Sequence, residues 1–273
     1  MIKNLLLRLI SIFSILFFTA CASHRVPILP GEIPTQNVLT EEEINLGAQV
    51  FRQLSSQFPI DNDLNRNRVV REIVYDLSDA AGGPNGGNPW HTYVFKDDNF
   101  KNAAATRGNY IFVWSGIINT ANSKDELATV LAHEVAHVLA SHTIPTVGET
   151  MNQILVGTSQ ELTQNILIHQ GGGYAQGAQL AGALTSLLLQ SLIVNPQTRK
   201  LEFEADTIGL FLMAKAGYNP NAALDFWDNM TKDNPDMSLS FLSSHPPSRE
   251  RVENIRKYLP EAYEIYRRRK GKK

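Results

Sequence analysis

Two histidines four residues apart enclose a glutamate in the run His133-Glu134-Val135-Ala136-His137. On a helix, positions four apart share one face, with about 5–6 Å between their Cβ atoms. Both imidazoles can therefore bind one Zn²⁺ at about 2.0–2.1 Å. Glu134 follows the first histidine and points to the side where a metal-bound water lies, so it can take that water's proton during attack on a carbonyl. The run predicts a hydrolytic zinc site.

The residues around this run distinguish a buried metal site from two solvent-exposed histidines, which is the simpler alternative. The run is flanked by apolar residues: Leu127, Val130, Leu131, Val138 and Leu139. Titrating groups in such surroundings are costly unless they are paired or ligated. We therefore interpret His133 and His137 as metal ligands.

A catalytic zinc takes three protein ligands and keeps a fourth position open, so another ligand is needed. The extended metzincin motif requires Gly three residues and His six residues after the second histidine. Ala140 and Thr143 occupy those positions, and His142 falls one place short, so that motif is excluded. A carboxylate is the better third ligand. The candidates are Glu149, Glu161 and Glu202.

Glu202 has the most suitable surroundings of the three. Asn165 stands four residues after Glu161, where an acid would support a ligating site, whereas Asp206 stands four residues after Glu202. On a helix, Glu202 can bind zinc while Asp206 accepts the free N–H of a ligand histidine and fixes its tautomer. Glu204 points elsewhere, and we expect it to be solvated. The alternative is that this acidic cluster forms a solvent-facing turn.

Helix caps and periodicity predict the elements that carry these residues. Ser123 and Glu126 form a capping box that opens a helix reaching about His142, ahead of Pro145. A second helix over 198–216 carries the acids. Other helices are expected over 40–58, 64–80, 220–232 and 247–258, and strands of one antiparallel sheet over 90–96 and 110–114. The fold class is α+β, mainly helical, with a small antiparallel sheet.

Three separated motifs resemble those of a known family. The run 133–137, the run 202–206 and Ser244-His245-Pro246 with Arg251 occur in the order found in zinc metalloendopeptidases of the HtpX, BepA and OMA type. The resemblance extends over about 40–259 and implies a zincin-like domain with one Zn²⁺ per chain. It implies the zinc ligands and general base derived above, and residues 102–106 resemble the family's edge-strand segment.

The resemblance also implies roles for two residues that spacing alone does not assign. His245 would lie near the metal, either stabilising the developing oxyanion or occupying the open position in a latched state. Arg251 would add a positive charge to the same oxyanion. Without the resemblance, His245 before two prolines is a loop residue, and Arg251 near Glu250 and Glu253 forms a surface ion pair.

The N-terminus is typical of a targeting segment. Lys3 and Arg8 precede a short apolar run and the small residues before Cys21, the sole cysteine. This predicts a lipoprotein signal peptide over 1–20 with Cys21 as the lipidated residue, although a plain signal peptide and an uncleaved anchor are alternatives. Residues 21–39 form a Pro-rich tether, and 40–273 form the metalloprotease domain. The segment resembles bacterial lipoproteins, in which Ala22 after the cysteine favours the outer membrane.

Composition limits the remaining classes of function. The chain has 273 residues, 43% of them hydrophobic and 19% charged, which favours a folded domain. Its net charge of −2 provides no basic field for nucleic acid. The remaining histidines, His24, His91, His142 and His169, are expected to have structural roles only.

These features together predict a zinc endopeptidase of the bacterial lipoprotein branch. The substrates expected are unfolded or misassembled cell-envelope proteins, bound as an extended chain along strand 110–114. Outer-membrane protein assembly factors and other proteases are possible partners. The alternatives are a zinc-holding chaperone lipoprotein without turnover, a protease latched by His245, and a peptidoglycan amidase. The apolar run 180–194 is expected to cover the cleft or touch the membrane surface.

Overall fold

The computed structural model describes residues 28–35, 38–83, 89–142, 199–232, 245 and 249–271. The predictions for the signal peptide, for Cys21, for residues 21–27, 36 and 37 of the tether and for the run 180–194 concern residues outside these ranges. The same is true of Glu149 and Glu161, so the structure does not compare them with Glu202.

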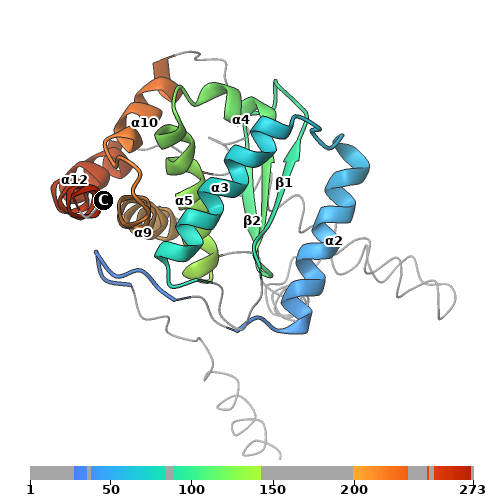
Figure 1. The fold of residues 1–273 in the computed structure, drawn as a ribbon, viewed down its shortest axis with the longest axis horizontal. Helices are drawn as coiled ribbons and strands as arrows, with labels where there is room; N and C mark the ends of the chain where they lie inside the picture. Colours follow the sequence, from blue (N-terminus) through green and yellow to red (C-terminus); the bar gives the residue numbers. More distant parts are fainter. Residues whose placement is uncertain are drawn as a thin grey trace, which may run out of the picture.

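Helices dominate the described part of the chain (Figure 1). The long helices on the N-terminal side are α2 (Glu41–Gln57) and α3 (Leu64–Ala80). The strands β1 (His91–Phe95), β2 (Ala103–Thr106) and β3 (Tyr110–Trp114) follow, with the short helix α4 (Ser115–Thr120) after them. The remaining helices are α5 (Lys124–Leu139), α9 (Arg199–Ala216), α10 (Ala222–Lys232) and α12 (Arg249–Lys270).

The sheet is mixed, so the prediction of an antiparallel pair was wrong. The strand order is β1-β3-β2; β1 runs parallel to β3, and β2 runs antiparallel to it. Gly108 and Asn109 have positive φ angles of 84° and 63° and turn the chain from β2 into β3. Sequence reasoning from propensity missed β2 because its alanines are depleted in strands, although 102–106 had been noted by resemblance as an edge strand.

The strand β3 is the central strand, which overturns its predicted role as a substrate template. Both of its edges already pair, with β1 on one side and β2 on the other. A central strand has no free N–H and C=O groups with which to add a peptide. Within the described sheet, β2 is an edge strand.

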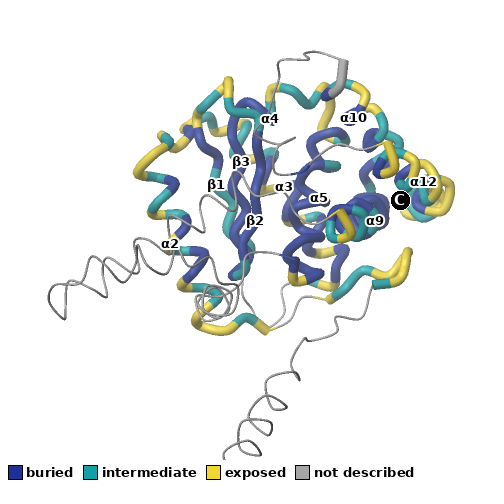
Figure 2. Tube along the Cα trace, turned by 180° about the vertical axis from the view of Figure 1, so that it is seen from behind, coloured by how far each residue is buried: buried dark blue, intermediate teal, exposed yellow. Residues whose placement is uncertain are grey.

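The two faces of β3 pack against different helices, which explains the layered arrangement in Figure 1. Phe112 and Trp114 face Leu46 and Leu54 of α2 in an aromatic cluster. Ile111 and Val113 share a second cluster with residues of α3, α5, α9, α10 and α12. Alternate side chains of a strand point to opposite faces, so one buried strand supports both clusters. Figure 2 shows that α5 lies within the buried interior, between the sheet and α9.

Local signals set most of the helix ends. Thr40 caps α2 with both halves of a capping box, since its hydroxyl accepts the N–H of Glu43 and the Glu43 carboxylate accepts the N–H of Thr40. The last helix, α12, continues past Pro260 to Lys270, beyond the predicted end near Tyr258. Ala262 is fully buried there, so packing of the second half compensates for the hydrogen bond that proline removes.

None of the helices in the described ranges combines the length and apolar character needed to cross a membrane.

Candidate metal centre

The helix α5 places the histidine–glutamate run in the interior. Ser123 caps its start by accepting the N–H of Glu126. Apolar residues around the helix draw it into the core, so that His133, Glu134 and His137 are only 5%, 2% and 3% exposed. Three titrating side chains are therefore held away from water, where each needs a partner or a ligand.

The helix α9 brings the distant acids against α5. Glu202 is 1% exposed and Asp206 is 7% exposed, so the acidic cluster is buried rather than a solvent-facing turn. Gly209 permits the close approach, because a Cβ there would lie 3.1 Å from the backbone nitrogen of His133.

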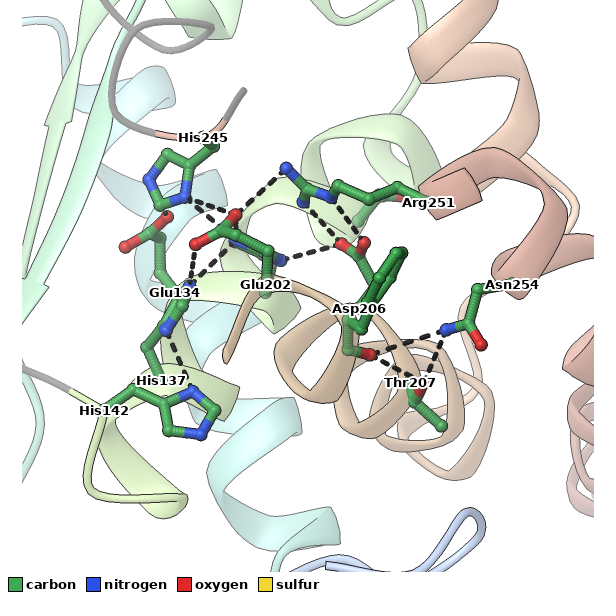
Figure 3. Close-up of polar contacts among 12 residues, drawn as sticks. Glu134, His137, His142, Glu202, Asp206, Thr207, His245, Arg251 and Asn254 are labelled. Atoms are coloured by element: carbon green, nitrogen blue, oxygen red, sulfur yellow. Dashed lines mark hydrogen bonds and ion pairs between the residues drawn. The ribbon is translucent and has the colours of Figure 1, made fainter. Parts of the chain in front are cut away.

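Four side chains converge on one point (Figure 3). His133 Nε2 lies 3.0 Å from His137 Nε2 and 3.4 Å from Glu202 Oε2, and His137 Nε2 lies 3.4 Å from Glu202 Oε1. His245 Nδ1 lies 3.1 Å from both His133 Nε2 and Glu202 Oε2. Donor atoms bound tetrahedrally at about 2.0–2.1 Å are separated by about 3.3–3.4 Å. The arrangement fits a small divalent ion.

The charges of the cluster also call for a cation. Three buried carboxylates, on Glu134, Glu202 and Asp206, face one guanidinium, on Arg251. When the imidazoles are neutral, as metal ligation requires, these groups carry a formal charge of −2, the complement of a divalent ion. Two buried oxygens, Oε1 of Glu134 and Oε1 of Glu202, make no hydrogen bond of good geometry. Buried oxygens rarely lack a hydrogen bond unless an ion or water binds them.

Asp206 and Arg251 lie behind His133. Asp206 Oδ1 is 3.0 Å from His133 Nδ1, the contact predicted from the sequence spacing. Arg251 donates two hydrogen bonds of 2.7 Å to the same carboxylate, and its Nη1 lies 2.9 Å from Glu202 Oε2. Its guanidinium also lies over the Trp227 ring at 4.7 Å. All three guanidinium nitrogens thus face acids. Arg251 therefore holds two buried carboxylates in place and does not form the surface ion pair that was the alternative.

His245 is brought into the cluster from a distant part of the chain. Its Nδ1 faces the ligand atoms, and its Nε2 lies 3.3 Å from Glu134 Oε1. The side chain is only 5% exposed. His245 therefore lies at the position that a fourth ligand would take, beside Glu134.

His142 and Glu204 also contact the cluster, and sequence reasoning assigned them no role. His142 Nδ1 lies 3.1 Å from His137 Nδ1, and His142 Nε2 lies 3.1 Å from Glu204 Oε2. Glu204 was predicted to be solvated, but its side chain is only 11% exposed. The prediction failed because Ile28 and His142 pack beside Glu204, with the Ile28 N–H 2.8 Å from Glu204 Oε1. The only sequence signal was the spacing of His142, five residues after His137.

The cluster shifts the pKa values of its members in different directions. Burial opposes protonation of His133, but hydrogen bonds with Asp206 and Glu202 raise its pKa to about 9. Burial and the charge of His133 lower the pKa of His137 to about 3. Burial raises the pKa of Glu134. Burial also opposes ionisation of Asp206, yet the charge of Arg251 holds its pKa below the usual range. The acids thus differ, and Glu134 is the one least committed to a charged partner.

Comparison with known proteins agrees with this geometry. The model of peptidase family M48 matches residues 64–259. The mitochondrial metalloendopeptidase OMA1 of Schizosaccharomyces pombe is 35% identical over 215 residues, which cover 77% of this chain and 56% of that protein. For OMA1 of Saccharomyces cerevisiae the identity is 33% over 187 residues, covering 66% and 50%.

A bacterial relative matches more of this chain at lower identity. The beta-barrel assembly-enhancing protease of Escherichia coli is 25% identical over 247 residues, which cover 90% of this chain and 48% of that protein. The chain spans about half the length of the curated relatives it matches. Since the family model covers α5, α9 and the part of α12 that carries Arg251, the chain belongs to peptidase family M48.

Proposed function

We propose that this chain is a zinc-dependent endopeptidase, with His133, His137 and Glu202 as zinc ligands and Glu134 as the general base. The observation that carries the proposal is the position of Glu134. Its carboxylate is buried beside the converging ligand atoms, has a raised pKa, and leaves Oε1 without a hydrogen bond of good geometry. A site that only stores or holds a metal has no need of such a group.

Zinc bound to these residues would lower the pKa of a water toward about 7 and polarise the scissile carbonyl. Glu134 accepts a proton from the attacking water as the water oxygen bonds to the carbonyl carbon. Glu134 then passes that proton to the amide nitrogen, and the C–N bond breaks to give an acid and an amine. Asp206 fixes the tautomer of His133 through Nδ1, and Arg251 holds Asp206 and Glu202 in place.

The substrate would bind as an extended chain along β2. This strand has a strand neighbour on one side only among the described residues, and it packs against α5, which carries Glu134. Asn102, directly before β2, is fully buried, and neither polar atom of its side-chain amide has a hydrogen-bond partner. An added peptide strand would pair through its main chain, which confers little sequence preference. Unfolded or misassembled cell-envelope proteins are therefore the substrates we propose.

The proposed location is the bacterial envelope, with the domain facing the periplasm and lipidated Cys21 in the outer membrane. The lipobox-like residues before Cys21 support this, as does the similarity to an Escherichia coli protease named for beta-barrel assembly. Envelope proteases and outer-membrane assembly factors are the partners we propose. Replacing Cys21 by Ser should release the protein from the membrane fraction, and persistent membrane association would contradict lipid anchoring.

The test of the catalytic assignment is the variant Glu134→Gln. It keeps the shape of the side chain but cannot take a proton, so we expect cleavage of unfolded casein to fall by about 10²–10⁴-fold. Zinc content should stay at one ion per chain, because Glu134 is not a ligand. Cleavage at the wild-type rate by the zinc-loaded variant would contradict the role of Glu134, whereas a zinc-loaded wild type that cleaves nothing would favour a zinc-holding chaperone.

A latched form of the same protease is favoured by the position of His245. Its Nδ1 lies 3.1 Å from both His133 Nε2 and Glu202 Oε2, where it closes the position that a catalytic water needs. We expect His245→Ala to raise the rate of casein cleavage by opening this position. A fall in rate with zinc content unchanged would instead assign His245 to stabilising the oxyanion.

A further inference from the structure

The end of α5 turns the chain back onto a proposed metal ligand. The helix ends at Leu139, three residues before the predicted end, because Ser141 adopts a left-handed conformation with φ of 54°. The N–H of His142 then donates to the His137 carbonyl at 2.7 Å, and the N–H of Ser141 donates to the Val138 carbonyl at 3.0 Å. This is a Schellman motif, formed here without glycine. It returns the His142 ring to His137, and the side chain is fully buried.

From His137, a chain of hydrogen bonds runs through His142 to Glu204, and one assignment of donors and acceptors satisfies all of them. His137 Nε2 faces the ligand cluster, so its lone pair is needed there and its proton resides on Nδ1 (Figure 3). That N–H is 3.1 Å from His142 Nδ1, which accepts it and leaves the His142 proton on Nε2. His142 Nε2 then donates to Glu204 Oε2 at 3.1 Å. The other oxygen, Glu204 Oε1, accepts the backbone N–H of Ile28 at 2.8 Å.

Ile28 lies within the predicted tether, residues 21–39, in the part of it that the structure describes, residues 28–35. Its side chain packs against Ala136 of α5, against Ala140 just after that helix, and against Ala205 and Ile208 of α9. The segment therefore contacts α5 and α9, the two helices that carry the three proposed zinc ligands. Glu204 joins a backbone group of this segment to the imidazole that supports His137.

We propose that His142 and Glu204 are positioning residues that orient His137 for metal binding, and that the 28–35 segment completes this support through the Ile28 N–H. The proposal rests on the proposed function only in that His137 binds a metal. Groups that accept the second N–H of a ligand histidine typically contribute about 10–100-fold to metal affinity. Part of the predicted tether thus contributes to the affinity of the site for its metal.

The experiment measures Zn²⁺ affinity of the purified full-length chain in detergent, by competition with a chromophoric chelator. His142→Phe keeps the ring volume but removes both nitrogens, and Glu204→Gln keeps the shape but cannot accept at both oxygens. We expect each to weaken zinc binding by about 10–100-fold. With Co²⁺ in place of Zn²⁺, both variants should also change the visible absorption of the ion, which reports ligand geometry.

Controls separate the contact from general destabilisation. Glu32→Gln removes a charge from the same segment without removing a contact to a ligand imidazole, and it should bind zinc as the wild type does. Ile28→Pro removes the N–H and also loses the isoleucine side chain, whereas Ile28→Ala keeps the N–H and loses most of that side chain, so the alanine variant controls for the lost packing. We expect the proline variant to bind zinc several-fold more weakly than the alanine variant. Melting temperatures of the metal-free proteins show whether each variant is folded.

The outcomes distinguish this inference from the proposed function. If the wild type binds no zinc, the proposed function fails. If the wild type binds zinc and His142→Phe and Glu204→Gln bind it equally well with unchanged Co²⁺ spectra, the positioning role is overturned. Equal affinities of Ile28→Pro and Ile28→Ala would overturn the part assigned to the segment.

Discussion

Among the residues that the structure describes, buried acids meet cations at two places, and the two are built differently. Before α3, Asp61 accepts hydrogen bonds from Arg66 Nε and Nη2 at 2.6 and 3.1 Å and from the Asp63 N–H at 2.9 Å. Asp61 is 4% exposed. The acid and its cation lie five residues apart and carry equal and opposite charge. This pair is complete without any further ligand.

The metal centre, by contrast, has more negative than positive charge. Its three carboxylates face one guanidinium, and the residues come from α5, α9 and α12. A buried charge without a partner is destabilising, so the arrangement persists at a cost to stability unless an ion occupies it. Balanced charge distinguishes a structural ion pair from a site built to receive a cation.

The largest effect expected from this comparison is the loss of stability in Asp61→Asn. The variant leaves the Arg66 guanidinium facing a neutral amide and weakens hydrogen bonds to a charged group. We expect the free energy of unfolding to fall by about 1.5–3 kcal/mol, measured by urea denaturation of the metal-free protein. Zinc affinity should not change, since Asp61 lies outside the cluster. A loss below about 0.5 kcal/mol would show that the pair contributes little.

The contribution of the Asp61–Arg66 pair should also appear in the pH dependence of the free energy of unfolding. The hydrogen bond from Arg66 lowers the pKa of Asp61. The contribution of the ionised Asp61 to folding stability is therefore fully present above the unfolded pKa of about 3.9. It is lost as the pH falls through the lower pKa of the folded state. Urea denaturation between about pH 5 and 2 should show a steeper loss of stability in the wild type than in Asp61→Asn. Parallel curves for the two proteins would contradict this assignment.

The smallest expected effect is a gain, rather than a loss, of folding stability. Glu134→Gln removes a buried carboxylate whose pKa is raised by burial, so the charge it removes is unfavourable in the metal-free protein. We expect the metal-free variant to be more stable than the wild type by about 1 kcal/mol, again measured by urea denaturation. A loss of stability as large as that of Asp61→Asn would mean that the two regions do not differ in the way described.

Much of the fold follows from local signals. The ends of α3 lie where periodicity placed them, and α2, at Glu41–Gln57, lies within the range 40–58 expected for it. The mixed sheet did not follow, because strand direction depends on which strands the hairpin at Gly108 joins, and alanine-rich β2 gives no strand pattern. The continuation of α12 beyond Pro260 depends on the tertiary burial of Ala262, which no local signal reveals.

The candidate site also has residues that the sequence identifies and residues that only the tertiary structure brings together. His133, Glu134 and His137 stand out because their spacing matches a helix turn, and Asp206 follows from its spacing to Glu202. His142 and Glu204 gave no such signal. Their contacts depend on a left-handed Ser141 and on a segment more than 100 residues earlier in the chain, which only the tertiary structure brings together.

The measurement closest to the central claim is the zinc content and affinity of the wild type beside Glu202→Gln. Glutamine keeps the shape of the side chain and removes the charge of the only carboxylate among the proposed ligands. We predict one zinc per wild-type chain, at least about 100-fold weaker binding by the variant, and loss of casein cleavage in parallel. A wild type that binds no zinc, or a variant that binds it equally well, would contradict the account.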